Sequence, residues 1–149
     1  IPDFLSVFSF SNRIFYYLLI TVPYQNRYIY SYKGGIFVRQ SALYSLLQLA
    51  GLRAQYLGYA YFADAVLLAS EDLTRLQNLR RDIYLPVAAK YHVSCPSVER
   101  DIRTARDVIF RHQNFEVFRT LGVYPLWKNA QPYPRECIAA FADYLARLS

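Results

Sequence analysis

The sequence predicts an all-α fold, a compact multi-helix domain that contains a helix-turn-helix and follows an aromatic-rich N-terminal segment of uncertain structure. From residue 41 onward, apolar residues recur at intervals of three and four, which is the period of an amphipathic helix. Two of these helical stretches are separated only by the short break HVSC, and a proline lies near the start of the second. A chain of 149 residues can bury one good core, whereas a second full domain would be cramped.

The charge and the cysteine content indicate which kind of partner the protein binds and in which cellular compartment it works. Seventeen lysines and arginines against 11 acids give a net charge of +6, which favours an anionic partner such as nucleic acid or a membrane surface. Cys95 and Cys137 are too few for a disulfide framework and form no CxxC pair, so we expect a reduced, cytosolic setting and no metal site. The sequence has no run of about 18 apolar residues, so no membrane-spanning helix is expected.

Residues 1–40 differ from the rest in composition, and we expect them to form a separate segment. They hold 11 of the 26 aromatic residues and one acid against four bases. Residues 14–22 resemble the apolar core of a signal peptide but lack a small-residue cleavage site after them. A second interpretation is a hairpin in residues 24–40 that turns at Gly34-Gly35. On a third, residues 1 to about 38 are a fragment end or upstream sequence without an evolved function.

We interpret residues 41–149 as one helical domain. A first helix should stop at Gly51, and a second, largely buried helix should follow at residues 61–72. A short helical turn is expected at residues 73–79, and the last helix should cover residues 134–148.

The helix-turn-helix is placed by its prolines. Its first helix should start or kink near Leu85, because Pro86 is tolerated only in a first helical turn. Pro96 suits the first position of the second helix, with Ser94 as its cap.

The second helix of this motif has an apolar side and a charged side. The apolar stripe consists of Val98, Ile102, Ala105 and Ile109. The opposite side carries Arg100, Arg103 and Asp107, flanked by Glu99 and Arg106. Arginine can donate two hydrogen bonds to a guanine edge and glutamate can accept one from cytosine. Glu99, Arg100 and Arg103 carry such groups on the charged side, and the predicted phosphate contacts are Lys90, Ser94, Arg106 and Arg111.

A solvated amphipathic helix with no partner would show the same charged side. Glu99 and Arg103 would then be an ordinary ion pair four residues apart. Periodicity alone does not decide between the two interpretations.

Longer segments carry a family resemblance. DIYLPVAAKYHVSCPSVERDIRTA (residues 82–105) resembles the DNA-binding C-terminal domain of stage zero sporulation protein A, a response regulator of endospore formation. GYAYFADAVLLASED and LGVYPLWKNAQPYPRECIAAFADYLA are similar to flanking parts of that family, so the resemblance covers about residues 46–148. It implies an all-helical effector domain that binds DNA as paired copies, with a recognition helix in the major groove. By position, Glu99, Arg100 and Arg103 match the family's base-facing residues.

The chain departs from the family pattern at several places. Ser97 stands where the family has an arginine, Asp101 replaces an alanine, and Pro96 lies one place early. Lysines of the family's late loop are replaced by Asn129 and Gln131. These differences concern affinity and target sequence more than the fold, and Lys128 and Arg135 are the candidates to replace the missing charge.

The resulting hypothesis is a sequence-specific DNA-binding transcription regulator of the sporulation type. The expected partners are double-stranded DNA, a second copy of the chain on DNA, and RNA polymerase, with no cofactor and no membrane, in the bacterial cytoplasm at the nucleoid. Residues 1–40 contain a single aspartate and are too short for a receiver domain, so we expect either a fragment or a stand-alone relative. The alternative is a helical protein-interaction module that kept the fold but lost DNA binding.

We expect no enzyme activity. His92 and Cys95 are three residues apart, and His112 lies on the same motif, but no orienting third group accompanies them.

Overall fold

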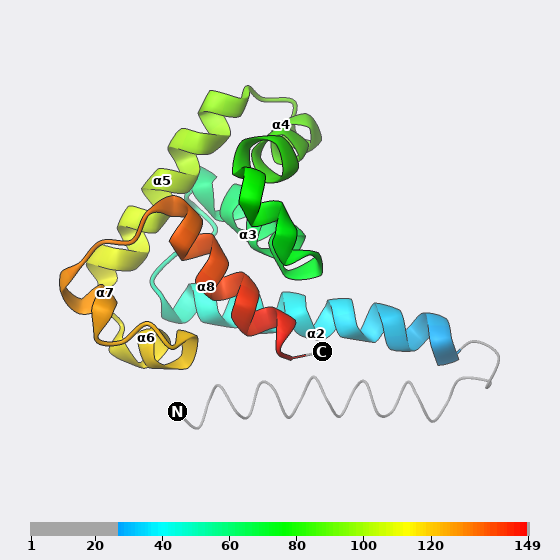
Figure 1. The fold of residues 1–149 in the computed structure, drawn as a ribbon, viewed down its shortest axis with the longest axis horizontal. Coiled ribbons are helices and arrows are strands. Elements are labelled where there is room, and N and C mark those ends of the chain that lie inside the picture. Colours follow the sequence, from blue (N-terminus) through cyan, green and yellow to red (C-terminus); the bar gives the residue numbers. More distant parts are fainter. Residues whose placement is uncertain (1–26, 149) are drawn as a thin grey trace.

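The computed structural model describes residues 27–148, and the side chains of residues 38–148 within them. This part of the chain is all-α and has no strand, as the sequence predicts. The elements are α2 (Arg27–Leu49), α3 (Leu57–Glu71), the 3₁₀-helix η2 (Leu73–Asn78), the π-helix η3 (Arg80–Tyr84), α4 (Leu85–Tyr91), α5 (Cys95–His112), α6 (Phe115–Leu121), α7 (Leu126–Asn129) and α8 (Pro134–Ala146). Figure 1 shows α4 and α5 joined by a short turn at one end of the bundle, with α2 along another side.

The core is built around α3, which packs against both α5 and α8. Phe62 of α3 and Phe141 of α8 are fully buried and meet edge to face, with ring centroids 5.5 Å apart. On the side facing α5, Gly58 lets the two helices approach closely, because a Cβ atom there would lie 2.2 Å from the backbone oxygen of Asp101. The position of α5 on the core therefore depends on the absence of a side chain at residue 58.

The hairpin expected in residues 24–40 is wrong, because residues 27–49 form the single helix α2. Gly34 and Gly35 lie within it, and a glycine inside a helix costs only about 1 kcal/mol relative to alanine. The segment boundary expected after residue 40 also falls inside α2, and the division of the chain into two parts stays a prediction. The apolar stretch at residues 14–22 lies outside the described residues.

The predicted stop of the first helix is confirmed. Gly51 adopts φ +85, a left-handed conformation that suits glycine, just after α2 ends. The amide of Leu52 donates to the carbonyl of Leu47 at 2.9 Å, and that of Gly51 donates to Gln48 at 3.1 Å. This is the paired hydrogen-bond pattern of a glycine C-cap.

The expected start or kink near Leu85 is a π-helical turn that leads into α4. The amide of Leu85 donates to the carbonyl of Arg80, five residues back. Pro86 has no amide hydrogen to donate, so the chain passes through the wider π turn and continues as an α-helix.

Two short helices between α5 and α8 were not predicted from the sequence. Asn114 caps α6, and its side-chain oxygen accepts hydrogen bonds from the amides of Glu116 and Val117 at 3.1 and 3.3 Å. Trp127 of α7 is buried against Phe118 of α6, with ring centroids 5.6 Å apart. Among residues 27–148, no helix has both the length and the apolarity to cross a bilayer.

Candidate nucleic-acid interface

α4, a three-residue turn and α5 form the predicted helix-turn-helix (Figure 1). α4 ends at Tyr91, and its C-cap residue His92 has a φ of +54. The amide of Val93 donates back to the carbonyl of Ala88 at 3.0 Å. α5 begins as expected, with Ser94 as its N-cap and a proline in its first turn. The Ser94 hydroxyl accepts a hydrogen bond from the amide of Ser97 at 3.3 Å.

The apolar stripe of α5 anchors this helix to the core, as predicted. Its members are at most 1% exposed, and they are Val98, Ile102, Ala105 and Ile109. Because the stripe is narrow, the opposite side of α5 remains available to solvent.

Glu99, Arg100 and Arg103, here called the base-facing row after the role predicted for them, lie together on the outer side of α5. The side chains of Arg100 and Arg103 are 70% and 53% exposed. Each arginine forms a weak ion pair with an acidic residue. Arg103 Nη2 lies 3.8 Å from Glu99 Oε1, and Arg100 Nε lies 3.4 Å from Asp101 Oδ1. Exposed pairs of this kind contribute little free energy, so these guanidinium groups can exchange their partners for another acceptor.

Tyr84 is part of the buried core and lies close to the base-facing row. It is 4% exposed, and burial raises the pKa of its hydroxyl to about 12, with the charge of Glu99 acting in the same direction. The hydroxyl is therefore neutral at physiological pH and adds no charge next to the row.

The ammonium group of Lys90 is less available for contact with a phosphate than the exposure of its side chain suggests. Its Nζ lies 2.7 Å from Asp64 Oδ2 on α3, and the hydroxyl of Tyr91 donates to the same oxygen at 2.7 Å. The hydrogen bond to Asp64 raises the pKa of Lys90. A phosphate would have to compete with this carboxylate for the ammonium group.

Arg106 differs from the other predicted phosphate contacts because its side chain is mostly buried. Its side chain is 12% exposed, with Nε 2.8 Å from Asp107 Oδ1, and Nη1 donates to the carbonyl of Pro132 at 3.0 Å. The side-chain amide nitrogen of Gln131, Nε2, donates to the same Asp107 oxygen at 2.6 Å. Arg106 and Asp107 thus connect α5 to the loop before α8, whereas Arg111 is exposed at the end of α5.

Two of these side-chain contacts could not be predicted from the sequence. Asp64 precedes Lys90 by 26 residues, and Pro132 follows Arg106 by 26, so neither pair is a local helical pair. The cap of α6 was detectable, because an asparagine directly before an apolar helical stretch is a common start signal.

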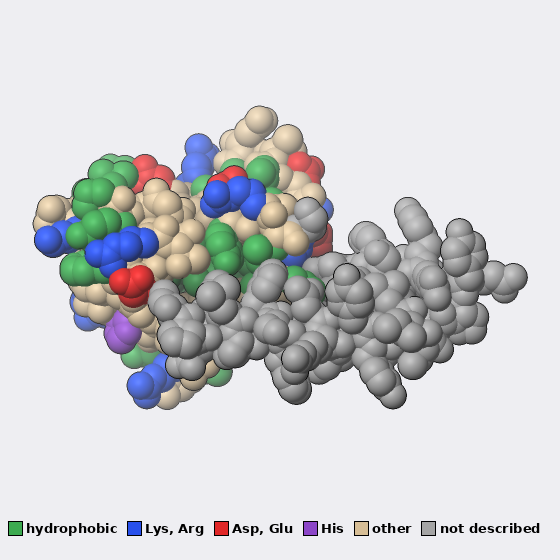
Figure 2. All heavy atoms as spheres, turned by 90° about the horizontal axis from the view of Figure 1, so that it is seen from below, with side chains coloured by type: hydrophobic (Ala, Val, Ile, Leu, Met, Phe, Trp, Pro, Cys, Tyr) green, Lys and Arg blue, Asp and Glu red, His purple; other side chains and the backbone are tan. Residues whose placement is uncertain are grey.

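The face of the molecule on the α2 side has mixed charge. Figure 2 shows Lys and Arg side chains beside Asp and Glu side chains there, with hydrophobic patches between them. No continuous basic area appears in the described part of this view.

A family model described as the C terminal of sporulation initiation factor Spo0A matches residues 43–145. The chain belongs to this family. The match begins in the second half of α2 and ends in α8, so it includes the whole helix-turn-helix. The resemblance seen in the sequence is confirmed, and the matched region is a DNA-binding effector domain of the sporulation-regulator type. The Spo0A C-terminal family is a family of DNA-binding domains and not of enzymes.

Proposed function

We propose that the chain is a sequence-specific transcription regulator that reads the major groove of double-stranded DNA with α5. The observation that supports this best is the combination of a fully buried stripe on one side of α5 and two exposed arginines on the other. A recognition helix must be held rigidly while its polar side chains reach base edges.

The members of the base-facing row have different roles in this proposal. Arg100 and Arg103 donate to the O6 and N7 acceptors of guanine, and Glu99 accepts from the amino group of cytosine. The weak pair between Glu99 and Arg103 keeps both side chains near one base step before DNA arrives.

Phosphate contacts are assigned to Lys90, Ser94 and Arg111, which flank the row on α4, the turn and the end of α5. Phosphate contact by Arg106 stays a prediction. Its burial and its hydrogen bond to Pro132 favour a positioning role, in which it holds the loop before α8 against α5.

A second copy on the DNA would place two recognition helices in successive major-groove turns, about 34 to 36 Å apart. RNA polymerase is the further partner that a transcription regulator needs. Both partners are part of the proposal.

The test is fluorescence anisotropy with two labelled duplexes, one carrying the consensus site of the Spo0A family and one scrambled, at several salt concentrations. The chain should prefer the consensus at least about tenfold, as specific complexes exceed nonspecific ones by much more. Equal binding to both duplexes that vanishes near physiological salt would contradict base reading and would favour a protein-interaction module instead.

A further inference from the structure

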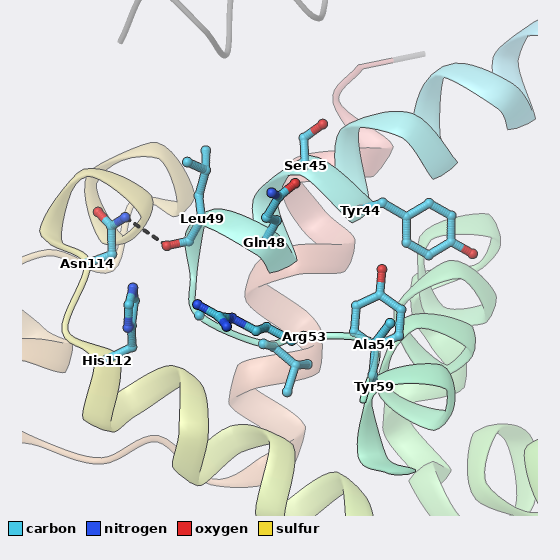
Figure 3. Close-up of a pocket in the computed structure, with 11 residues that line it drawn as sticks. Tyr44, Ser45, Gln48, Leu49, Arg53, Ala54, Tyr59, His112 and Asn114 are labelled. Atoms are coloured by element: carbon cyan, nitrogen blue, oxygen red, sulfur yellow. Dashed lines mark hydrogen bonds between the residues drawn. The ribbon is translucent and has the colours of Figure 1, made fainter. Parts of the chain in front are cut away.

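An open cleft of about 980 Å³ lies between the end of α2, the loop before α3, and the junction of α5 and α6. Figure 3 shows the side chains around it, which come from two stretches far apart in the sequence, residues 44–59 and residues 112–114. Its size is within the range of small-ligand sites. The Spo0A-type DNA contacts do not account for it.

The cleft lies on another side of α5 from the base-facing row. His112 lines the cleft and follows Arg103 by nine residues, which corresponds to about 180° around a helix after whole turns are removed. A small ligand in the cleft would therefore not occupy the side of α5 that faces the bases.

One end of the cleft carries hydrogen-bond donors and positive charge. Figure 3 shows the Arg53 side chain extending along the cleft in the direction of His112. Arg53 is exposed and makes no ion pair with any residue in the described part of the chain. The imidazole of His112 lies close to Gly51, where a Cβ atom would come within 2.5 Å of His112 Cγ. A guanidinium without an ion-pair partner, on the same side of the cleft as an imidazole, suits an oxyanion.

The other end of the cleft is aromatic. The rings of Tyr44 and Tyr59 are stacked, with centroids 6.0 Å apart and planes inclined by 20°. Tyr44 is 41% exposed, so part of its side chain is accessible to a further ring. Gln48 and Ser45 project from α2 between the two ends and offer neutral hydrogen-bonding groups (Figure 3).

We propose that this cleft binds a small oxyanion attached to a planar aromatic ring, such as an aromatic phosphate monoester. Arg53 and His112 donate hydrogen bonds to the oxyanion, and the ring stacks on Tyr44. A small molecule fits better than a peptide strand, because the donors and the rings converge on one concave space. The proposal does not depend on which DNA sequence the protein reads.

The experiment is calorimetric titration of the folded chain with phenyl phosphate, inorganic phosphate and phenol. Phenyl phosphate should saturate one site with a dissociation constant of about 1 mM or below, a value reasonable for a ligand of its size. Arg53→Gln should weaken phenyl phosphate about tenfold, since it removes a charged hydrogen bond. Tyr44→Leu should weaken it about threefold and leave inorganic phosphate unchanged.

Arg147→Gln is the matched control, because Arg147 is an exposed arginine outside the cleft. It should leave phenyl phosphate binding as in the native chain. No saturation by phenyl phosphate, or equal loss in Arg53→Gln and Arg147→Gln, would overturn the proposal. Binding of inorganic phosphate as tight as that of phenyl phosphate would overturn the role of the aromatic end.

Arg53 could bind a phosphate of DNA and not that of a small ligand. Fluorescence anisotropy with a labelled duplex distinguishes these two sources of the phosphate. The proposal expects Arg53→Gln to leave DNA affinity unchanged while phenyl phosphate binding falls. Weaker DNA binding by this variant, without any binding of phenyl phosphate to the native chain, would show a DNA contact and would overturn the small-ligand site.

Discussion

Lys90 Nζ lies 2.7 Å from Asp64 Oδ2, and this contact joins the first helix of the helix-turn-helix to the central helix of the core. The Tyr91 hydroxyl donates to the same oxygen, so a single carboxylate on α3 holds the end of α4. The pair also neutralises one of the cations that flank the base-facing row. Asp64 therefore positions the motif, and under the proposed function it also reduces the attraction of the motif for DNA.

Asp64→Asn should raise DNA affinity about threefold at low salt, because Lys90 no longer has an anionic partner, while the amide oxygen can still accept from Tyr91. The gain should shrink as salt rises. Anisotropy with a scrambled duplex measures it. Asp143→Asn is the control, since it adds the same unit of charge on α8, where Asp143 pairs with Arg147. An equal gain in DNA affinity in both variants would show that the effect comes from net charge alone.

Gly58→Ala should destabilise the fold by about 3 kcal/mol, because its Cβ would overlap the backbone oxygen of Asp101 and force α3 away from α5. Gly122→Ala is the comparison. The φ of +76 at residue 122 would strain an alanine, but its Cβ would have no neighbour within 4 Å, so this variant should cost only about 1 kcal/mol. Urea unfolding of both variants checks this, and equal losses would contradict the close crossing of α3 and α5.

Tyr84 should make stability fall at high pH. Burial raises its pKa in the folded chain to about 12 from an ordinary value of about 10. Its contribution is therefore complete below pH of about 10 and is lost as the pH rises through the folded-state pKa of about 12. Urea midpoints of the native chain should fall more steeply between pH of about 10 and 12 than those of Tyr84→Phe. Parallel curves would show that Tyr84 does not carry the effect.

Arg106→Gln should separate a positioning role from a phosphate contact. Loss of the bonds to Asp107 and Pro132 should lower stability by about 1 to 3 kcal/mol. If Arg106 only positions the loop, the slope of log affinity against log salt should stay as in the native chain. Arg111→Gln, the exposed comparison, should reduce that slope by about 0.9. A similar reduction of the slope in Arg106→Gln would indicate that Arg106 does contact a phosphate.

The parts of the fold that could be predicted have local causes. Ser94 and Pro96 placed the start of α5, Gly51 placed the stop of α2, and the spacing of Val98 and Ile102 gave the buried stripe. Each of these signals acts within one or two helical turns of its own residue.

The parts that failed depend on tertiary context. The aromatic residues before residue 40 have high β-propensity, but that propensity reflects packing on a sheet, and the described residues form none. The partners of Lys90 and Arg106 come from α3 and from the loop before α8, so their reduced availability needed the structure. The cleft likewise joins segments from Tyr44 to Asn114 that show no common motif.

The most direct test of the central claim is a double-mutant cycle between Arg103→Ala and single 7-deazaguanine substitutions along the consensus duplex. The modified base lacks the N7 acceptor, so it removes one hydrogen bond without changing base pairing. If Arg103 reads a guanine, one position should cost the native chain about 1 to 3 kcal/mol and cost Arg103→Ala almost nothing. Arg147→Ala, an exposed arginine with a similar ion pair, should behave as the native chain does. Equal losses in the native chain and Arg103→Ala at every guanine would contradict base reading by this residue.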